Sequence, residues 1–349
     1  MYNNLYRIIG KILAENGETR TLTLLQLTNR IISKHLSVIE EPLVFEYDTH
    51  DIDFNYDYNI ELIIDGTGLI SWGDGNETEF SGSIRNTYKK NGLYRVKLYH
   101  KKNIYRVIFD EQTLSCITNF ITIGRIGING LNHMFANSDF NGKIGPNWDT
   151  GKVKNMSYMF YNAKKFNQPI GYWDLSNVTD LTNMFNGAES FDRHIGNWDV
   201  SKVVDMDRMF HDAVSFNRPL DNWNVSNVSN MSGMFKYAER FNQPLNNWDI
   251  SKVAHMSRMF MGAVSFNKPL DNWNVSRVTD MTQMLYQATS FNQSINNWKL
   301  EELKHMDKIL LGAEDFDQKV ELDVTNWKIT QSMFQDTKLE GRRIKLIVD

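Results

Sequence analysis

A tryptophan recurs every 25 residues in the second half of the chain, and this period constrains the fold more than any other feature. The tryptophans that keep the interval are Trp148, Trp173, Trp198, Trp223, Trp248, Trp273 and Trp298. A methionine column from Met134 to Met284 and a phenylalanine column from Phe166 to Phe316 keep the same spacing. Three columns in register indicate a repeat array, in which each unit buries its apolar face only by stacking on its neighbours.

One unit, residues 241–263, combines two apolar patterns. Leu245, Trp248 and Ile250 form an L-x-x-W-x-I segment that predicts a short strand with its alternate side chains inward. Apolar residues at spacings of three and four then follow from Val253 to Ala263, and such a stripe predicts a short helix facing a core. The expected architecture is a right-handed, leucine-rich-repeat-like strand–helix solenoid of about nine coils.

The repeated columns are expected to serve packing and coil-to-coil bonding. A tryptophan ladder could offer a platform for sugars, but an inward position between polar neighbours favours core packing. The methionine column is likewise interpreted as core, because methionine fills irregular gaps. An asparagine follows the phenylalanine in five units and is expected to bond the backbone of the adjacent coil. These asparagines are Asn167, Asn217, Asn242, Asn267 and Asn292.

Two resemblances to known families follow from these motifs. The unit W-D-V-S-x-V-T-D-M-x-x-M-F-x-x-A-x-x-F-N-Q-P-L, over about residues 120–334, resembles the 25-residue repeat of BspA-like leucine-rich-repeat surface proteins. That resemblance implies a surface-exposed scaffold for binding or adhesion, with a protein or a glycan as ligand. Residues 69–98, with W-G-D-G at 72–75 and later Tyr88 and G-L-Y-R-V at 92–96, resemble a PKD-like immunoglobulin sandwich. That module implies a spacer or interaction domain.

The chain is therefore expected to have three parts and a mixed β and α/β fold. Residues 1–40 form a helical arm, residues 41–116 a PKD-like β-sandwich, and residues 117–349 the solenoid with its terminal caps. The apolar face of the arm consists of Leu5, Ile8, Ile9, Ile12 and Leu13. This arm could pack on the sandwich, or it could dock onto a larger assembly, which would make the chain a structural or decoration component of a viral or phage particle. Charge interrupts the apolar runs of the start, so no signal peptide is expected. No cysteine there could carry a lipid, and the localisation stays open between a cell and a virion surface.

The candidate binding face is an outward polar column beside the tryptophans. Strand alternation would place it, with the serines two residues further on, on the outer side of the array. Its members are Asp149, Asp174, Asp199, Asn224, Asp249, Asn274, Ser176, Ser201, Ser226, Ser251 and Ser276. This face could bind cations, glycans or basic proteins, or it could be a solvated face whose Asn and Ser side chains bond neighbouring coils. If it binds a partner, alanine at the aspartates should abolish binding without lowering the melting temperature.

Composition and motifs exclude several function classes. With 38 Lys and Arg against 42 Asp and Glu, the chain has no basic footprint for nucleic acid. Its one cysteine, Cys116, rules out an intrachain disulfide and thiolate metal clusters, and no apolar run is long enough for a membrane helix. Neither a catalytic motif nor a cofactor or metal motif is present, so we expect no enzyme; a histidine such as His211 is interpreted as surface filling. Residues 74–77 (D-G-N-E) could bind calcium weakly, but they fit a tight turn better, and the open ends of the array allow a homo-oligomer.

Overall fold

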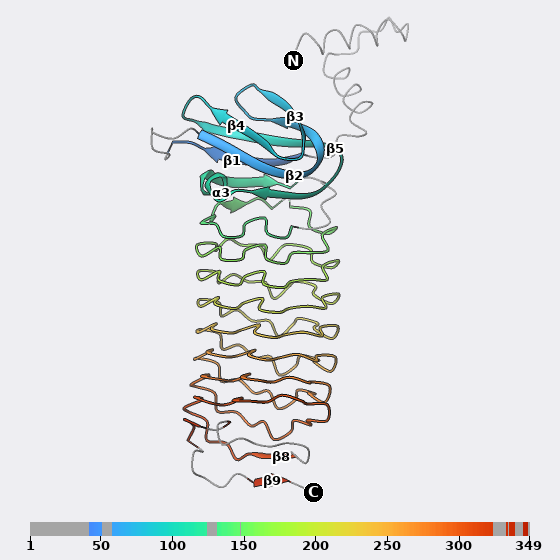
Figure 1. Cartoon of the computed structure of the whole chain (residues 1–349), viewed down its shortest axis with the longest axis vertical. Coiled ribbons are helices and arrows are strands. Elements are labelled where there is room, and N and C mark those ends of the chain that lie inside the picture. The colour runs from blue at the N-terminus through green and yellow to red at the C-terminus, as the bar shows by residue number, and fades with distance from the viewer. Residues whose placement is uncertain are drawn as a thin grey trace, which may run out of the picture.

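The computed structural model describes residues 42–50, 58–123, 131–146, 148–323, 333, 335–338 and 345–347. A β-sheet part leads into a long stack of coils, and a short strand pair lies at the far end (Figure 1). The expected helical arm, residues 1–40 with Leu5, Ile8, Ile9, Ile12 and Leu13, lies outside the described residues.

The sheet contains seven strands in the order β3-β2-β5-β1-β6-β7, with β4 also paired to β2. The elements are β1 (Leu43–Asp48), β2 (Tyr58–Ser71), β3 (Glu77–Ser81), β4 (Ile84–Tyr88), β5 (Leu93–Phe109), α3 (Glu111–Cys116), β6 (Ile117–Thr122) and β7 (Lys143–Ile144). All pairs are antiparallel except β6–β7, so the sheet is mixed.

The expected PKD-like β-sandwich is wrong, because its strands form one mixed sheet in which β2 and β5 run unbroken over 14 and 17 residues. At Gly68 an added Cβ would lie 2.0 Å from the carbonyl oxygen of Tyr99, so the missing side chain lets the two strands stay paired. Register shifts in β2 between Asp65 and Gly68 mark an irregularity in the ladder. The ring of Phe45 in β1 then packs edge-on against Phe109 at 5.4 Å, although the residues at the two positions do not pair. One continuous sheet thus bends over its own core.

The expected strand–helix solenoid is also wrong, because between β7 and β8 the described coils at residues 148–320 contain neither a helix nor a strand longer than an isolated bridge. Among the described residues the only helix is α3, which has six residues. The segment predicted as a strand is a turn that the Trp248 amide closes by donating to the Leu245 carbonyl at 3.1 Å. The segment predicted as a helix alternates two kinds of backbone bond. The Met259 amide donates to the Met256 carbonyl in the same coil at 3.3 Å, whereas the Phe260 amide donates to the Met284 carbonyl of the next coil at 2.8 Å.

The physical reason lies in two left-handed residues in each coil. In the unit at 241–263 they are Arg258, with φ of 57°, and Gly262, with φ of 68°. A residue in this conformation cannot continue a right-handed helix. The apolar spacing of three therefore reflects successive tight turns between buried residues, and the β-bridges between the described coils are isolated parallel ones such as Asp205–Asn230.

Core packing of the repeated columns is confirmed. The tryptophans of the array are 2–4% exposed, and most successive rings stack, as Trp198 and Trp223 do at 6.3 Å. The core is continuous with that of the sheet, since Phe120 of β6 packs edge-on against Phe135 of the first coil at 5.1 Å. At the other end, β8 (Glu321–Asp323) pairs in parallel with β9 (Lys345–Ile347).

Candidate binding faces of the coil stack

The predicted acidic column is exposed, but its side chains build turns. Asp149, Asp174, Asp199, Asn224, Asp249 and Asn274 are all exposed, and Ser176, Ser201, Ser226, Ser251 and Ser276 are half-buried. The side-chain oxygen of each Asp or Asn accepts a bond from the backbone amide two residues on, as Asp199 does from Ser201 at 3.0 Å. Hydrogen bonds from Ser201 lower the pKa of Asp199, and those from Ser251 lower the pKa of Asp249. These bonds lie within one coil. The solvated-face interpretation had instead expected the Asn and Ser side chains to bond neighbouring coils.

Lysines beside the acidic column further reduce its capacity for cations. Lys202 and Lys252 add a favourable charge next to Asp199 and Asp249, and the Lys202 ammonium also donates to Asn177 Oδ1 at 2.7 Å. In the described part of the chain no three His, Cys, Asp or Glu side chains converge as metal ligands would. The turn at residues 74–77 is the predicted tight turn, with the Asn76 amide donating to Asp74 Oδ1 at 2.8 Å.

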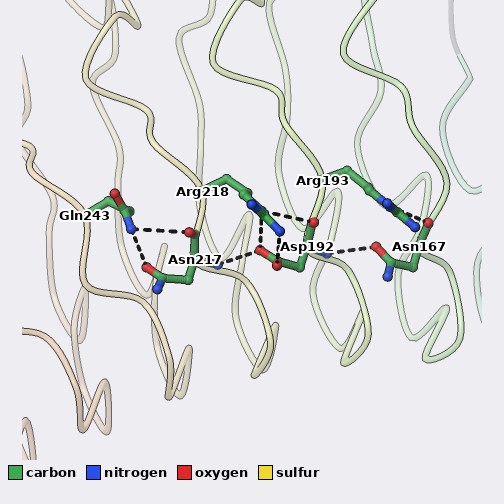
Figure 2. A network of polar contacts seen from close by, with 6 residues as sticks. All are labelled: Asn167, Asp192, Arg193, Asn217, Arg218 and Gln243. Carbon is green, nitrogen blue, oxygen red and sulfur yellow. Dashed lines mark hydrogen bonds and ion pairs between the residues drawn. The ribbon is translucent and has the colours of Figure 1, made fainter.

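A second face is an inter-coil ladder, as the asparagine column predicted (Figure 2). The Asn242 amide donates to Asn217 Oδ1 at 3.0 Å, and Gln243 Nε2 donates to the same oxygen at 2.8 Å. One step of the ladder is ionic, because Arg218 Nε donates to Asp192 Oδ1 at 2.9 Å and Arg218 Nη2 donates to Asp192 Oδ2 at 2.6 Å. The polar groups of these steps satisfy one another, which favours a structural role for the ladder.

A third face, which we name the corner face, comprises the two left-handed residues of each coil and the residue just before the second. Its first column holds seven residue types in eight coils: His133, Tyr158, Asn183, Arg208, Gly233, Arg258, Gln283 and Lys308. Its second column also holds seven: Ala136, Tyr161, Asn186, His211, Lys236, Met261, Tyr286 and Leu311. The acidic column holds only three types in seven coils, Asp, Asn and the final Lys299. The corner face thus varies much more from coil to coil than the acidic column does.

The middle of the corner face contains cations, a tyrosine and a half-buried histidine. The Lys236 ammonium lies 5.0 Å from the centre of the Tyr237 ring, and the His211 ring lies 6.0 Å from that of Tyr237. Desolvation by burial is the largest cause that lowers the pKa of His211, to about 4, and the Lys236 charge adds to it. The His211 side chain is only 16% exposed, so its interpretation as surface filling is wrong. Burial likewise lowers the pKa of Lys236, and Arg258 and Arg208 lower it further.

The same face is aromatic near the sheet. The rings of His133 and Tyr158 stack at 4.7 Å across two coils, and Tyr161 lies 5.4 Å from Tyr158. Sequence reasoning missed this face because it followed the columns that repeat. The positions whose residue type changes from unit to unit were the signal that could have indicated this face.

The comparisons with known proteins concern the array. The sequence profile of a family described as "Mycoplasma protein of unknown function, DUF285" matches residues 129–248 and again residues 239–345. No curated protein and no solved structure matches significantly. None of the helices in the described part of the chain has the length and apolarity needed to span a bilayer. The family match is consistent with the BspA-like repeat expected from the sequence, and it covers more than half of the chain. The chain is a member of the DUF285 family.

Proposed function

We propose that this protein is a non-enzymatic, surface-displayed binding or adhesion scaffold that contacts a protein or glycan partner through the corner face. The observation that carries the proposal is that the columns differ in burial and in how their polar groups are bonded. The tryptophan, methionine and phenylalanine columns are buried, and the asparagine ladder and acidic turns use their own polar groups. The corner face combines changing residue types with exposed side chains at Arg208, Arg258 and Lys308, although its Asn183 and Asn186 are buried. Repeat scaffolds use extended surfaces of stacked coils for binding.

The backbone of the corner face supports the same proposal. The Arg208 amide donates to the Ser232 carbonyl of the next coil at 2.8 Å, and the His211 amide donates to the Arg208 carbonyl at 3.2 Å. Because these bonds tie each corner to its neighbours, the side chains are held on a fixed frame. Binding then costs little backbone conformational entropy in the protein.

The acidic column is a weaker candidate for the partner site, because its carboxylates already accept backbone bonds. A structural role in a viral or phage particle would depend on residues 1–40, and no observation on the described residues favours it over binding.

The test uses the full chain on arrays of glycans and extracellular proteins. One variant replaces Tyr158, Arg208 and Lys236 by alanine, and the matched variant replaces Asp174, Asp199 and Asp249 by alanine. We expect specific ligands to be lost by the first variant and retained by the second. Loss only in the second variant would assign the site to the acidic column, and failure of the unchanged chain to bind any component would refute the proposal for these two ligand classes.

A further inference from the structure

A cluster of positive charge on the corner face lies around a glycine. Arg208, Gly233 and Arg258 follow one another in the first column, one coil apart. A Cβ placed on Gly233 would meet Arg208 Cγ at 3.2 Å and Lys236 Cβ at 3.9 Å, so the Arg208 side chain packs closely against the buried glycine and Lys236 lies beside it. With coils spaced like strands, about 4.8 Å apart, the two arginines are separated by roughly 10 Å along the stack. We name this place the Gly233 notch.

Carboxylates compensate these cations only in part. Arg208 Nη1 lies 3.7 Å from Asp207 Oδ2, whereas Arg258 Nε donates to the neutral amide oxygen of Gln283 at 2.9 Å. Among the described residues no carboxylate lies within ion-pair distance of the Lys236 ammonium. The nearby Asp212 instead lies 3.3 Å from His211 Nε2. Burial raises the pKa of Asp207 and of Asp212, whereas the Arg208 charge lowers the first pKa and the Lys236 charge lowers the second.

We propose that the Gly233 notch binds the anionic groups, sulfate or carboxylate, of an acidic polysaccharide, through Arg208, Lys236 and Arg258. The proposal rests on the proposed binding function and names its ligand class. Arginine offers a planar fork of donors that suits sulfate and carboxylate oxygens, and lysine adds a point charge. An anion placed between three cations would also relieve their mutual repulsion.

A polysaccharide is favoured over an acidic peptide by the state of the backbone. The amides of Asp212, Tyr237 and Arg258 donate to carbonyls of the next coil at 2.8, 2.7 and 2.9 Å. A peptide laid along this face would therefore find these amides already paired, so it could not add as a strand. Sugar hydroxyl groups need only side-chain partners, and the aromatic rings of Tyr158 and Tyr161 on the same face supply a surface for sugar rings.

The test measures the affinity of the full chain for four probes: a heparin oligosaccharide, hyaluronate, uncharged dextran and poly-glutamate. Heparin carries sulfate and carboxylate groups, whereas hyaluronate carries carboxylates only, so the two distinguish the sources of the anion. The variant Arg208→Gln/Lys236→Gln/Arg258→Gln is expected to weaken binding of the acidic sugars by about tenfold or more. The matched variant Lys152→Gln/Lys202→Gln/Lys252→Gln removes the same charge from another face and is expected to change affinity by less than about twofold.

A second variant, Gly233→Asn, tests the notch without changing charge. Asparagine adopts the required backbone at the equivalent Asn183, where φ is 55°, so the variant should fold while its side chain fills the notch. Equal losses from both charge variants, unchanged binding by Gly233→Asn, or tighter binding of poly-glutamate than of the sugars would each overturn the assignment. If the corner face binds an uncharged glycan or a protein that the charge variant retains, the scaffold function stands and the notch inference fails.

Discussion

Two tryptophans of one column differ in a single hydrogen bond, and this difference predicts unequal costs for the same substitution. Trp223 Nε1 donates to the Ile195 carbonyl at 3.1 Å, whereas Trp173 Nε1 is buried without a hydrogen-bond partner among the described residues. Both side chains are 3% exposed. Each stacks on two rings of its own column, Trp223 at 6.3 and 6.4 Å and Trp173 at 5.4 and 6.4 Å.

Replacement by phenylalanine leaves a similar void at both positions, so the cavity cost, roughly 1–3 kcal/mol, largely cancels in the comparison. Trp223→Phe also loses a net hydrogen bond of about 1 kcal/mol. The loss is no larger, because the Ile195 carbonyl keeps the bond from the Trp198 amide at 3.1 Å. Trp173→Phe instead removes an unsatisfied donor, which returns about 1 kcal/mol or more. Trp223→Phe is therefore expected to be the more destabilising by about 2 kcal/mol.

The assay is denaturant unfolding of the full chain followed by circular dichroism. Stacked repeats can open from one end, so hydrogen exchange at amides of the substituted coil gives the local opening free energy in parallel. Equal costs for Trp173→Phe and Trp223→Phe, or a larger cost for Trp173→Phe, would refute the role assigned to the indole hydrogen bond.

Three further outcomes are expected. Arg218→Gln should lower stability by about 1 kcal/mol because it breaks the partly buried ion pair with Asp192. Adding Asp192→Asn should restore most of the lost stability by rebuilding an Asn–Gln step, and thermal melts of the single and double variants measure both effects. Asp199→Ala should lower the melting temperature at pH 7, since its carboxylate holds a turn. Its folded pKa is lowered, so the contribution is fully present above the unfolded value of about 3.9 and lost as the pH falls through the folded one; a cost that persists below that pH would contradict this. Gly73→Ala should destabilise the protein more than Gly75→Ala. Both glycines have positive φ, but only at Gly73 would a Cβ meet backbone atoms of β5, at 2.8 Å. Denaturant melts of the two variants measure the difference, and a larger cost for Gly75→Ala would contradict this reasoning.

The columns of the array could be predicted residue by residue. Identical units can stack only if equivalent side chains superpose, so a strict 25-residue period decides which residues contact one another. The burial of Trp248 and Met259 and the inter-coil bond from the Asn242 amide to Asn217 follow from this. The β-rich character of residues 41–116 could be predicted from the sequence, but not the continuity of β2 through Gly68.

The candidate site was only partly predictable. The acidic column is exposed as expected, but the sequence does not reveal that the Asp249 carboxylate bonds the Ser251 amide. The corner face escaped prediction because its importance lies in how Arg208, Lys236 and Arg258 come together. Lys236 occupies a different column from the two arginines, and only the folded turn brings it close enough for both of their charges to act on it.

The sequence by itself determined the repeat, its period and the contents of the core, because side-chain chemistry and spacing suffice for these. The tertiary structure decided the backbone of each coil. Apolar residues three apart suit a helix and a chain of tight turns almost equally over so short a segment. The left-handed backbone of residues such as Arg258 and Gln283 cannot be recognised from their residue type. The turns are favoured because alternate amides of each coil can then donate to carbonyls of the next coil, as the Phe260 amide does to the Met284 carbonyl. In a helix the same amides would donate to carbonyls of their own helix.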